Sequence, residues 1–380
     1  MFAATIGMFA SMTLALGLLL AFTPYLMRHN ECFAVTVPAA AQADPRIVAL
    51  KKRYATVMLA LTAAATVVSL VAGVLIASGG EQAESARALA GSFAECAAIL
   101  VLVVASFALM LCNRRTVMGL KKQEGWGAER TRVAAVVAET DLPGALPLAW
   151  NLLYLPVILG TLALGLALYP HMPDMLPMHA DINGTVTRYE PKTLATAIGF
   201  PVLLEAFLAA CFTFTQWMML RSKRPTDPSA PATSALAYGL FARAQSVFLL
   251  VIGILLGAGI GILFMLSSAG FIGLGQAGAI IVVLCIPIVV GSIALSVVYG
   301  QAGSRVFRRM QGDAPLLADD DEHWKLGLFY VNHDDASLFL PERFGIGWTM
   351  NFARPAAWAI ILGGAAATAA FVVALVLIVG

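Results

Sequence analysis

YPHMPDMLPMHADINGTVTRYEPK, residues 169–192, decides how this sequence folds. The stretch is a polar connector that gathers two His, two Asp, four Pro and an Asn-Gly pair, and it separates two apolar runs at 147–167 and 193–220. A helix of about 20 apolar residues is long enough to cross the roughly 30 Å of bilayer hydrocarbon. The stretch therefore connects two membrane-spanning helices, and the fold follows from how many such runs the chain contains.

Eight runs of this kind predict the architecture. They lie at roughly 3–27, 56–78, 93–112, 147–169, 193–220, 241–268, 276–299 and 355–379. The composition agrees, since 60% of the residues are hydrophobic and 12% are charged, whereas soluble domains average about 25% charged residues. We therefore predict an all-α polytopic membrane protein with eight transmembrane helices. The basic residues lie in short clusters beside the spans, which argues against direct nucleic-acid binding.

Lys and Arg residues orient the spans. If the N-terminus lies on the outer side, only Arg87, Arg188 and Lys192 of the 24 basic residues lie on that side and the rest lie on the inner side, as the positive-inside rule requires. We therefore predict that both termini and the connector 169–192 lie on the outer face. The alternative is a signal peptide cleaved at 41–43, Ala-Gln-Ala, which would leave one span fewer. Against this alternative, the first apolar run, 3–27, has no basic segment before it and is too long for the apolar part of a signal peptide.

The spans divide the chain into five segments. We assign 1–144 to helices 1–3 with their inner loops, 145–220 to helices 4–5 with the outer loop, 221–300 to an inner linker with helices 6–7, 301–354 to a small cytoplasmic β-rich domain, and 355–380 to helix 8. Pro and small residues predict linkers at 28–53 and 221–235. Residues 127–139 are interpreted as an amphipathic helix on the inner membrane surface.

The cytoplasmic segment carries strand signals and an acidic run. We predict strands at 325–331, 337–340 and 345–352, separated by turn residues. The acidic run at 319–322 is interpreted as solvated. A metal site built from this run with His323 and His333 is the alternative.

The outer loop holds most of the candidate site residues. Three prolines stiffen its first half, and Asn183-Gly184 predicts a turn. The candidate ligand-binding residues are His171, Asp174, His179, Asp181, Asn183, Lys192, Glu95 and Glu205. The spacing of the two His and two Asp matches no metal template. Hydrogen bonds of His179 and its neighbours within the loop are therefore favoured over a divalent metal, and we predict no metal, no cofactor and no catalytic residue.

Two carboxylates lie inside predicted spans. Glu205 is near the middle of the fifth span, where a charge costs at least about 2.5 kcal/mol unless it is paired, protonated or in a wet cavity. It is either a proton-titrating or ligand-contacting group, or a protonated carboxyl bonded to a Ser, Thr or Asn. Glu95, near the outer end of the third span, either reaches water or forms part of the outer site. Glycines at 253, 257 and 261 predict close helix packing.

Two segments resemble known families. The first carries Tyr169-Pro170, Leu176-Pro177, His179, Asn183-Gly184 and Lys192 directly after a span. This pattern resembles the bacterial domain of unknown function found in SdpI-like membrane proteins, over about residues 145–205. The segment 324–352 is similar to a small uncharacterised C-terminal domain often fused to it. The resemblance implies a multi-pass protein of the bacterial inner membrane, and its best-understood kind confers immunity to a secreted killing peptide and holds a repressor at the membrane.

Three functions are compatible with these features. The first is a non-enzymatic immunity or sensor protein that recognises an envelope-active peptide or lipid-like ligand at its outer loop and signals through the cytoplasmic segment 301–354. The second is a proton-coupled transporter that uses Glu205. The third is a membrane-embedded metal-dependent enzyme, for which no known catalytic motif is present. The expected partners are membrane lipids, the outer ligand and a cytoplasmic regulator at 301–354.

Overall fold

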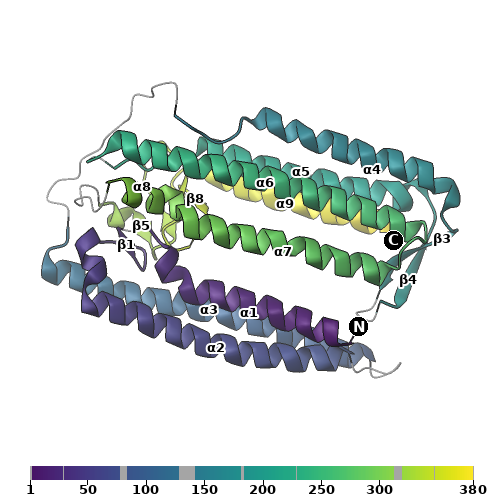
Figure 1. Cartoon of the computed structure of the whole chain (residues 1–380), viewed down its shortest axis with the longest axis horizontal. Helices are drawn as coiled ribbons and strands as arrows, with labels where there is room; N and C mark the ends of the chain where they lie inside the picture. Colours follow the sequence, from purple (N-terminus) through teal and green to yellow (C-terminus); the bar gives the residue numbers. More distant parts are fainter. Residues whose placement is uncertain are drawn as a thin grey trace. The chain divides into compact units, whose positions relative to one another are not determined.

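The computed structural model describes most of the chain (Figure 1). The described residues are 2–28, 30–77, 84–127, 142–180, 184–227, 229–311, 319–345 and 347–379. They form two compact units. Unit 1 comprises Met1–Pro143, Lys223–Phe241 and Ser296–Ala353, and unit 2 comprises Gly144–Ser222, Ala242–Leu295 and Arg354–Gly380. Each unit contains its own cluster of buried apolar side chains.

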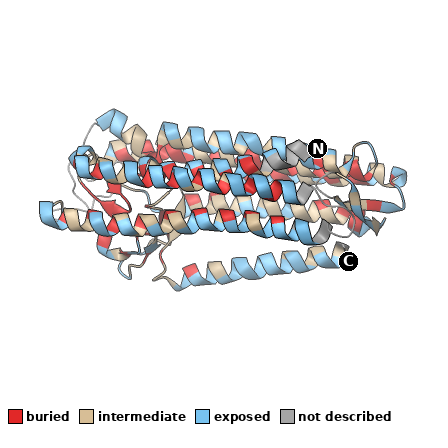
Figure 2. Cartoon of the chain, turned by 90° about the horizontal axis from the view of Figure 1, so that it is seen from below, coloured by how far each residue is buried: buried red, intermediate tan, exposed pale blue. Residues whose placement is uncertain are grey.

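Eight helices in the described part of the chain are long and apolar enough to cross a membrane, as predicted. They are α1 (Phe2–Leu26), α2 (Pro45–Ala77), α3 (Glu84–Glu124), α4 (Tyr154–Leu168), α5 (Phe200–Arg221), α6 (Pro231–Ser268), α7 (Leu274–Tyr299) and α9 (Pro355–Val379). Helix α4 reaches the required length together with the 3-10 turns on either side, which extend the span to Leu148–His171. A helix forms hydrogen bonds between its own backbone N–H and C=O groups, which is necessary in a membrane because hydrocarbon offers them no other partner. Much of their apolar surface is exposed, and α9 is exposed along nearly its whole length (Figure 2). Such a surface is suited to contact with lipid.

In unit 1, α1, α2 and α3 pack into a bundle. Gly17 of α1 lies so close to α2 that a Cβ atom there would be 2.3 Å from the Thr62 side chain. The Tyr54 hydroxyl lies 2.7 Å from the Ser106 hydroxyl and joins α2 to α3. Both α2 and α3 extend beyond the predicted spans, because α2 already begins at Pro45 and α3 continues to Glu124. Proline suits the first turn of α2, where its missing N–H would have no helical partner.

The predicted linker at 28–53 is wrong, because it contains a buried hairpin as well as the start of α2. Strand β1 (Glu31–Cys32) pairs antiparallel with β2 (Val35–Thr36). In the turn between them, the backbone φ angles of Phe33 and Ala34 are 46° and 59°. Residues other than glycine rarely adopt positive φ. Phe33 is fully buried and its ring centroid lies 5.5 Å from that of Tyr54. Packing in the bundle therefore holds this turn in place.

We call residues 319–353 the inner module. It contains two short antiparallel hairpins, β5 (Trp324–Lys325) with β6 (Phe329–Tyr330) and β7 (Phe339–Pro341) with β8 (Trp348–Met350). A bridge between Tyr330 and Asn351 joins the two hairpins. The prediction of one strand over 325–331 is wrong, because the backbone reverses at positive φ within it.

Two neighbouring segments complete this end of unit 1. Helix α8 (Ser304–Gln311) follows α7. In the predicted flexible linker 221–235, Lys223 is fixed: its backbone N–H donates to the Phe339 carbonyl at 2.8 Å, and its ammonium lies 2.6 Å from Asp335. Helix α6 then begins at Pro231. The prediction of a flexible linker is therefore wrong at Lys223, which is bonded to two residues of the inner module.

In unit 2, α4 packs lengthwise on the glycine face of α6. A Cβ atom on Gly253 would lie 2.4 Å from the Tyr154 hydroxyl, and one on Gly257 would lie 3.6 Å from Val157. One turn further on, a Cβ atom on Gly261 would meet the side chain of Thr161 at 2.3 Å. Because the numbers rise together along both helices, the helices run parallel. Side chains of α4 thus fill the space along these glycines, and the close approach of another helix at this face stays a prediction.

Candidate functional site

The connector 169–192, which was predicted to lie on the outer face, folds as a hairpin between α4 and α5. Strand β3 (Met175–Ala180) pairs antiparallel with β4 (Val186–Pro191), with irregular register around His179. Leu176 on β3 is fully buried and packs in a cluster with Ile198 and Met265. Because alternate residues of a strand face opposite sides, the flanking positions project away from this cluster. Met175 and Tyr189 are accordingly exposed, at 47% and 52% of their surface.

Lys192 anchors the base of this hairpin. Its backbone N–H donates to the Asp174 carbonyl at 2.7 Å, and its ammonium donates to the Met172 carbonyl at the same distance. The ammonium also lies 5.3 Å from the ring centre of Tyr169, close enough for a cation–π contact. Lys192 thus joins the two ends of the connector. We had predicted it as a ligand-binding residue, and the structure shows it bonded within the connector itself.

The remaining predicted loop residues are not brought together as one set. His171 and Asp174 are exposed. His179 is exposed on β3, with its Nδ1 atom 2.6 Å from the Thr187 hydroxyl of β4. Asp181 and Asn183 lie outside the described residues, as does most of the predicted amphipathic helix at 127–139. Among the residues that the structure describes, no group of three or more His, Cys, Asp or Glu side chains is placed to hold a metal ion.

A π-helical turn, Ala195–Gly199, joins the hairpin to α5. Pro201 has no N–H to donate to the carbonyl of Ala197, so a regular α-helical turn would lose a hydrogen bond here. Thr193 and Thr196 hold the turn through reciprocal bonds, with the Thr193 N–H donating to Thr196 and the Thr196 N–H donating to Thr193, each at 3.0 Å. The hairpin is thus joined to α5 through a turn that these two threonines hold.

Glu205 is buried where α4, α5 and α6 meet. Only 2% of its surface is exposed, and its Oε1 atom accepts a hydrogen bond from the Thr161 hydroxyl at 2.7 Å. Its Oε2 atom is buried with no hydrogen-bond partner among the described residues. A Cβ atom on Gly261 would lie 1.8 Å from Oε1, so only glycine leaves room for the carboxyl. The sequence located this carboxylate, and the structure adds its threonine donor and glycine wall.

Glu95 has a similar arrangement inside unit 1. It is 5% exposed on α3, and its Oε1 atom accepts a hydrogen bond from the Thr13 hydroxyl of α1 at 2.7 Å. The Thr13 hydroxyl lies 2.8 Å from that of Ser69 on α2. The second oxygen of Glu95 is also buried without a partner in the described part of the chain. This carboxyl thus lies among three helices of the bundle.

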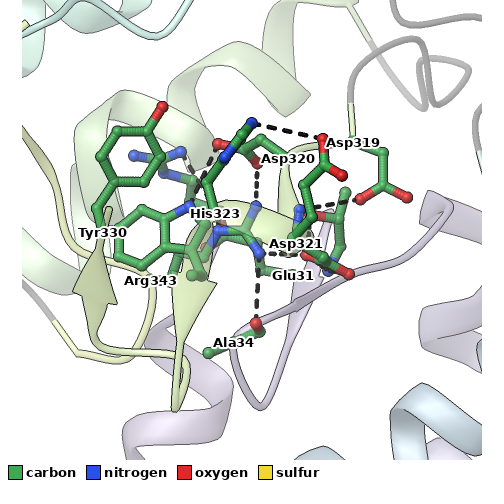
Figure 3. Close-up of polar contacts among 12 residues, drawn as sticks. Glu31, Ala34, Asp319, Asp320, Asp321, His323, Tyr330 and Arg343 are labelled. Carbon is green, nitrogen blue, oxygen red and sulfur yellow. Dashed lines mark hydrogen bonds and ion pairs between the residues drawn. The ribbon is translucent and has the colours of Figure 1, made fainter. Parts of the chain in front are cut away.

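The inner module contains an ion cluster that sequence reasoning missed (Figure 3). Asp321, which was expected to be solvated, is 9% exposed. It accepts hydrogen bonds from the Thr36 backbone N–H at 3.0 Å, from the Thr36 hydroxyl at 2.9 Å and from the Lys121 ammonium at 2.6 Å. The Arg343 guanidinium donates to it as well. The cluster thereby joins β2, α3 and the inner module, and the solvated interpretation is wrong for Asp321.

Arg343 is the cationic centre of this cluster and is 3% exposed. It forms ion pairs with Asp320 and Asp321, and its Nε atom lies 3.8 Å from Glu31. Its guanidinium carbon lies 4.9 Å from the Trp324 ring centre. Arg343, Glu31 and Asp321 are almost closed to water, so their charges interact strongly, whereas the Asp320 side chain is 52% exposed.

The surroundings shift the pKa values of Asp321 and Glu31 in opposite directions. Burial by itself would raise the pKa of Asp321, but the Arg343 charge and the hydrogen bonds from Lys121 and Arg343 hold that pKa below its ordinary value. Burial raises the pKa of Glu31, and the charges of Arg28 and Arg343 oppose this only in part. Asp321 therefore remains the anionic partner of the cluster.

Comparison with known families supports the coarse assignment. Residues 157–204 match the model of a domain of unknown function (DUF1648), and residues 333–358 match a family of unknown function (DUF5808). The first match covers most of α4, the hairpin, the π-helical turn and the start of α5, and it ends one residue before Glu205. No curated protein and no solved structure matches the chain. The chain is thus a multi-pass membrane protein with two regions similar to families of unknown function.

Proposed function

We propose that this protein is a non-enzymatic receptor or immunity protein of the bacterial inner membrane. Its outer hairpin β3–β4 binds an amphipathic, envelope-active peptide, and the inner module passes the signal to a cytoplasmic regulator. The observation that carries the proposal is the two-sided construction of the hairpin. One face is held by Leu176 and the base is tied by Lys192, whereas the other face exposes Met175 and Tyr189.

The exposed face suits an amphipathic peptide for two reasons. Met and Tyr side chains supply apolar contact area, and such residues are enriched at binding surfaces. The sheet has only two strands in the described part of the chain, so each strand keeps one edge free to pair with an extended peptide.

The chain provides a continuous route from this hairpin to the inner module. The hairpin leads through the π-helical turn into α5, which ends at Arg221. Two residues later, Lys223 bonds to Phe339 and Asp335 of the inner module. A ligand shifts a conformational equilibrium only if it binds one state more tightly than the other. A peptide that binds more tightly to one arrangement of the π-helical turn would, under this proposal, change the position or hydrogen bonding of Lys223.

The test is peptide binding and survival. A host lacking the gene is challenged with a panel of membrane-active peptides and complemented with wild type, a Met175→Ala/Tyr189→Ala variant, or Phe271→Ala. Phe271 is the matched control, because it is 66% exposed between α6 and α7, in another predicted outer connector. We expect the double variant to lose both protection and binding of the active peptide to the purified protein, and Phe271→Ala to keep both. Equal behaviour of the two variants would refute the hairpin assignment.

A proton-coupled transporter is the second candidate, and the buried Glu205 favours it. A carboxyl with one unpartnered oxygen inside a span is suited to bind and release a proton if water reaches it. Proton flux into vesicles that contain the purified protein, compared between wild type and Glu205→Gln, tests this candidate. Flux that Glu205→Gln abolishes would favour transport over the receptor function.

A further inference from the structure

A cavity of about 440 Å³ opens beside the inner end of α3. Leu111, Arg115, Met118 and Lys122 line it from α3, and Leu326 lines it from the turn between β5 and β6. The four α3 residues are spaced by four, three and four positions, so they share one face of the helix. That face alternates apolar and basic side chains. Arg114 and Gly119 complete the lining.

The cavity carries positive charge without a matching carboxylate in its lining. Arg115 and Lys122 are exposed and form no ion pair with any described residue. Arg114 is buried, and its guanidinium donates to the carbonyl oxygens of Ala34 and Trp324. The Asp321 carboxylate also interacts with the Arg114 charge. An anion that entered the cavity would therefore meet two cations that form no ion pair with a described residue, Arg115 and Lys122.

Leu326 is held over the cavity in an unfavourable backbone conformation. Its φ is 53°, and 55% of its surface is exposed. A bulky residue rarely adopts positive φ unless its surroundings impose it. The next residue, Gly327, is pressed against Arg114, because a Cβ atom there would lie 3.2 Å from the Arg114 Cδ atom. The turn thus keeps an apolar side chain at the mouth of a basic cavity.

The cavity lies where α3 passes from apolar to basic sequence. The apolar run 93–112 ends at Leu111 and Cys112, and the basic residues begin at Arg114. A ligand that carries both a phosphate and hydrocarbon matches this succession, since cations next to spans attract anionic headgroups. A free phosphate ester shares the charge but would leave Leu111, Met118 and Leu326 without a contact.

We propose that this cavity binds the phosphate headgroup of an anionic phospholipid of the inner leaflet. Arg115 and Lys122 contact the phosphate, while Leu111, Met118 and Leu326 contact the first methylenes of the acyl chains. The bound lipid would join α3 to the β5–β6 turn of the inner module, both within unit 1. The proposal does not depend on the function of the outer hairpin.

The test compares lipid binding to the full-length protein in detergent by native mass spectrometry. The ligands are phosphatidylglycerol, phosphatidylcholine with matched chains, and inorganic phosphate as a competitor. The variants are Arg115→Gln/Lys122→Gln and the control Lys52→Gln/Arg53→Gln. The control removes one exposed Lys and one exposed Arg from α2, outside the cavity lining.

We expect phosphatidylglycerol to bind more tightly than phosphatidylcholine. Arg115→Gln/Lys122→Gln should weaken this binding by about 30-fold, because each cation near an anionic lipid contributes about a fivefold gain in affinity. The control should change it less than about threefold. Equal losses in the two double variants, or equal affinity for both lipids, would overturn the proposal. Displacement of the lipid by millimolar inorganic phosphate would assign the cavity to a soluble phosphate ester instead.

A second variant separates loss of binding from loss of folding. Leu326→Gly removes an apolar contact but relieves the positive-φ strain, because glycine adopts this conformation freely. We expect the thermal stability of the lipid-free protein to be unchanged or higher and phosphatidylglycerol binding to weaken severalfold. Unchanged lipid binding in this variant would contradict the role of Leu326 in the cavity.

Discussion

Removing Arg343 should open the inner module. The guanidinium is 3% exposed and is paired with Asp320 and Asp321, with Glu31 nearby. Arg343→Ala leaves these buried or half-buried carboxylates without their shared cation. Breaking a buried ion pair by removing one partner typically costs about 3–5 kcal/mol. We therefore expect a loss of this size in the stability of the module against local opening.

Arg46 supplies the matched control. It also pairs with two acids, Asp44 at 2.7 Å and Glu124 at 2.9 Å, but its side chain is 48% exposed. Exposed ion pairs contribute only about 0–1 kcal/mol because water screens them. Arg46→Ala removes the same side chain and two ion pairs, whereas Arg343→Ala removes two short ion pairs and the longer one with Glu31. The two variants therefore differ mainly in the burial of the ion pairs.

Cys32 reports the opening directly. Its thiol is fully buried on β1, and burial raises its pKa to about 11, so a maleimide reaction requires opening of the structure. The other four cysteines are exposed and are replaced by alanine. A loss of 3 kcal/mol predicts at least about a 100-fold faster reaction of Cys32 in Arg343→Ala. Equal rates in Arg343→Ala and Arg46→Ala would refute the view that the buried cluster holds the module closed.

Three further predictions concern single positions. Gly261→Ala should lower the thermal stability of the detergent-solubilised protein by about 1–3 kcal/mol, since its Cβ would lie 1.8 Å from Glu205; Gly257→Ala, with 3.6 Å to its nearest neighbour, should change the stability little. Burial raises the pKa of Glu342 to about 7 from 4.5, so the folded module binds the proton more tightly than the unfolded chain. The module should lose stability as the pH rises from about 4.5 to 7. Glu342→Gln should reduce this dependence, measured as the rate of the Cys32 reaction in the folded protein divided by its rate in the unfolded protein at each pH, since the thiol itself reacts faster as the pH rises. Lys192→Met should make proteolysis of the outer hairpin about 5- to 30-fold faster, because the ammonium's hydrogen bond and cation–π contact are lost.

The transmembrane architecture could be predicted because its signal is local. A span is decided by some 20 consecutive side chains and by the solvent around them, so no distant partner needs to be known. The glycines at 253, 257 and 261 also predicted close packing, because their four-residue spacing lies on one face of a helix. Which helix fills that face was not predictable from the spacing, and the structure shows that it is α4.

The ion cluster could not be predicted, because its partners are far apart in the sequence. Asp321 bonds to Thr36, 285 positions away, and to Lys121, 200 positions away. A run of acidic residues is usually solvated, and nothing local to 319–322 distinguishes the buried Asp321 from its neighbours. The same reason explains the failed linker prediction at 28–53, since Phe33 becomes a core residue only through contact with Tyr54.

The two intramembrane carboxyls show how far the sequence can reach toward mechanism. Each was found as an acidic residue within an apolar run. In the structure each accepts one hydrogen bond of 2.7 Å from a threonine, Thr13 for Glu95 and Thr161 for Glu205, and each leaves its second oxygen without a partner among the described residues. An unpaired carboxylate oxygen is costly in hydrocarbon, whereas a neutral carboxyl with one accepted bond is much less so. Each threonine therefore offsets part of the cost of burying its carboxyl group. Glu205 differs in that Gly261 of a third helix, α6, lies directly against it, so a change at Gly261 alters both the packing of α6 and the surroundings of this carboxyl. Neither the glycine nor the threonine donor could be assigned from the sequence, because both lie on other helices.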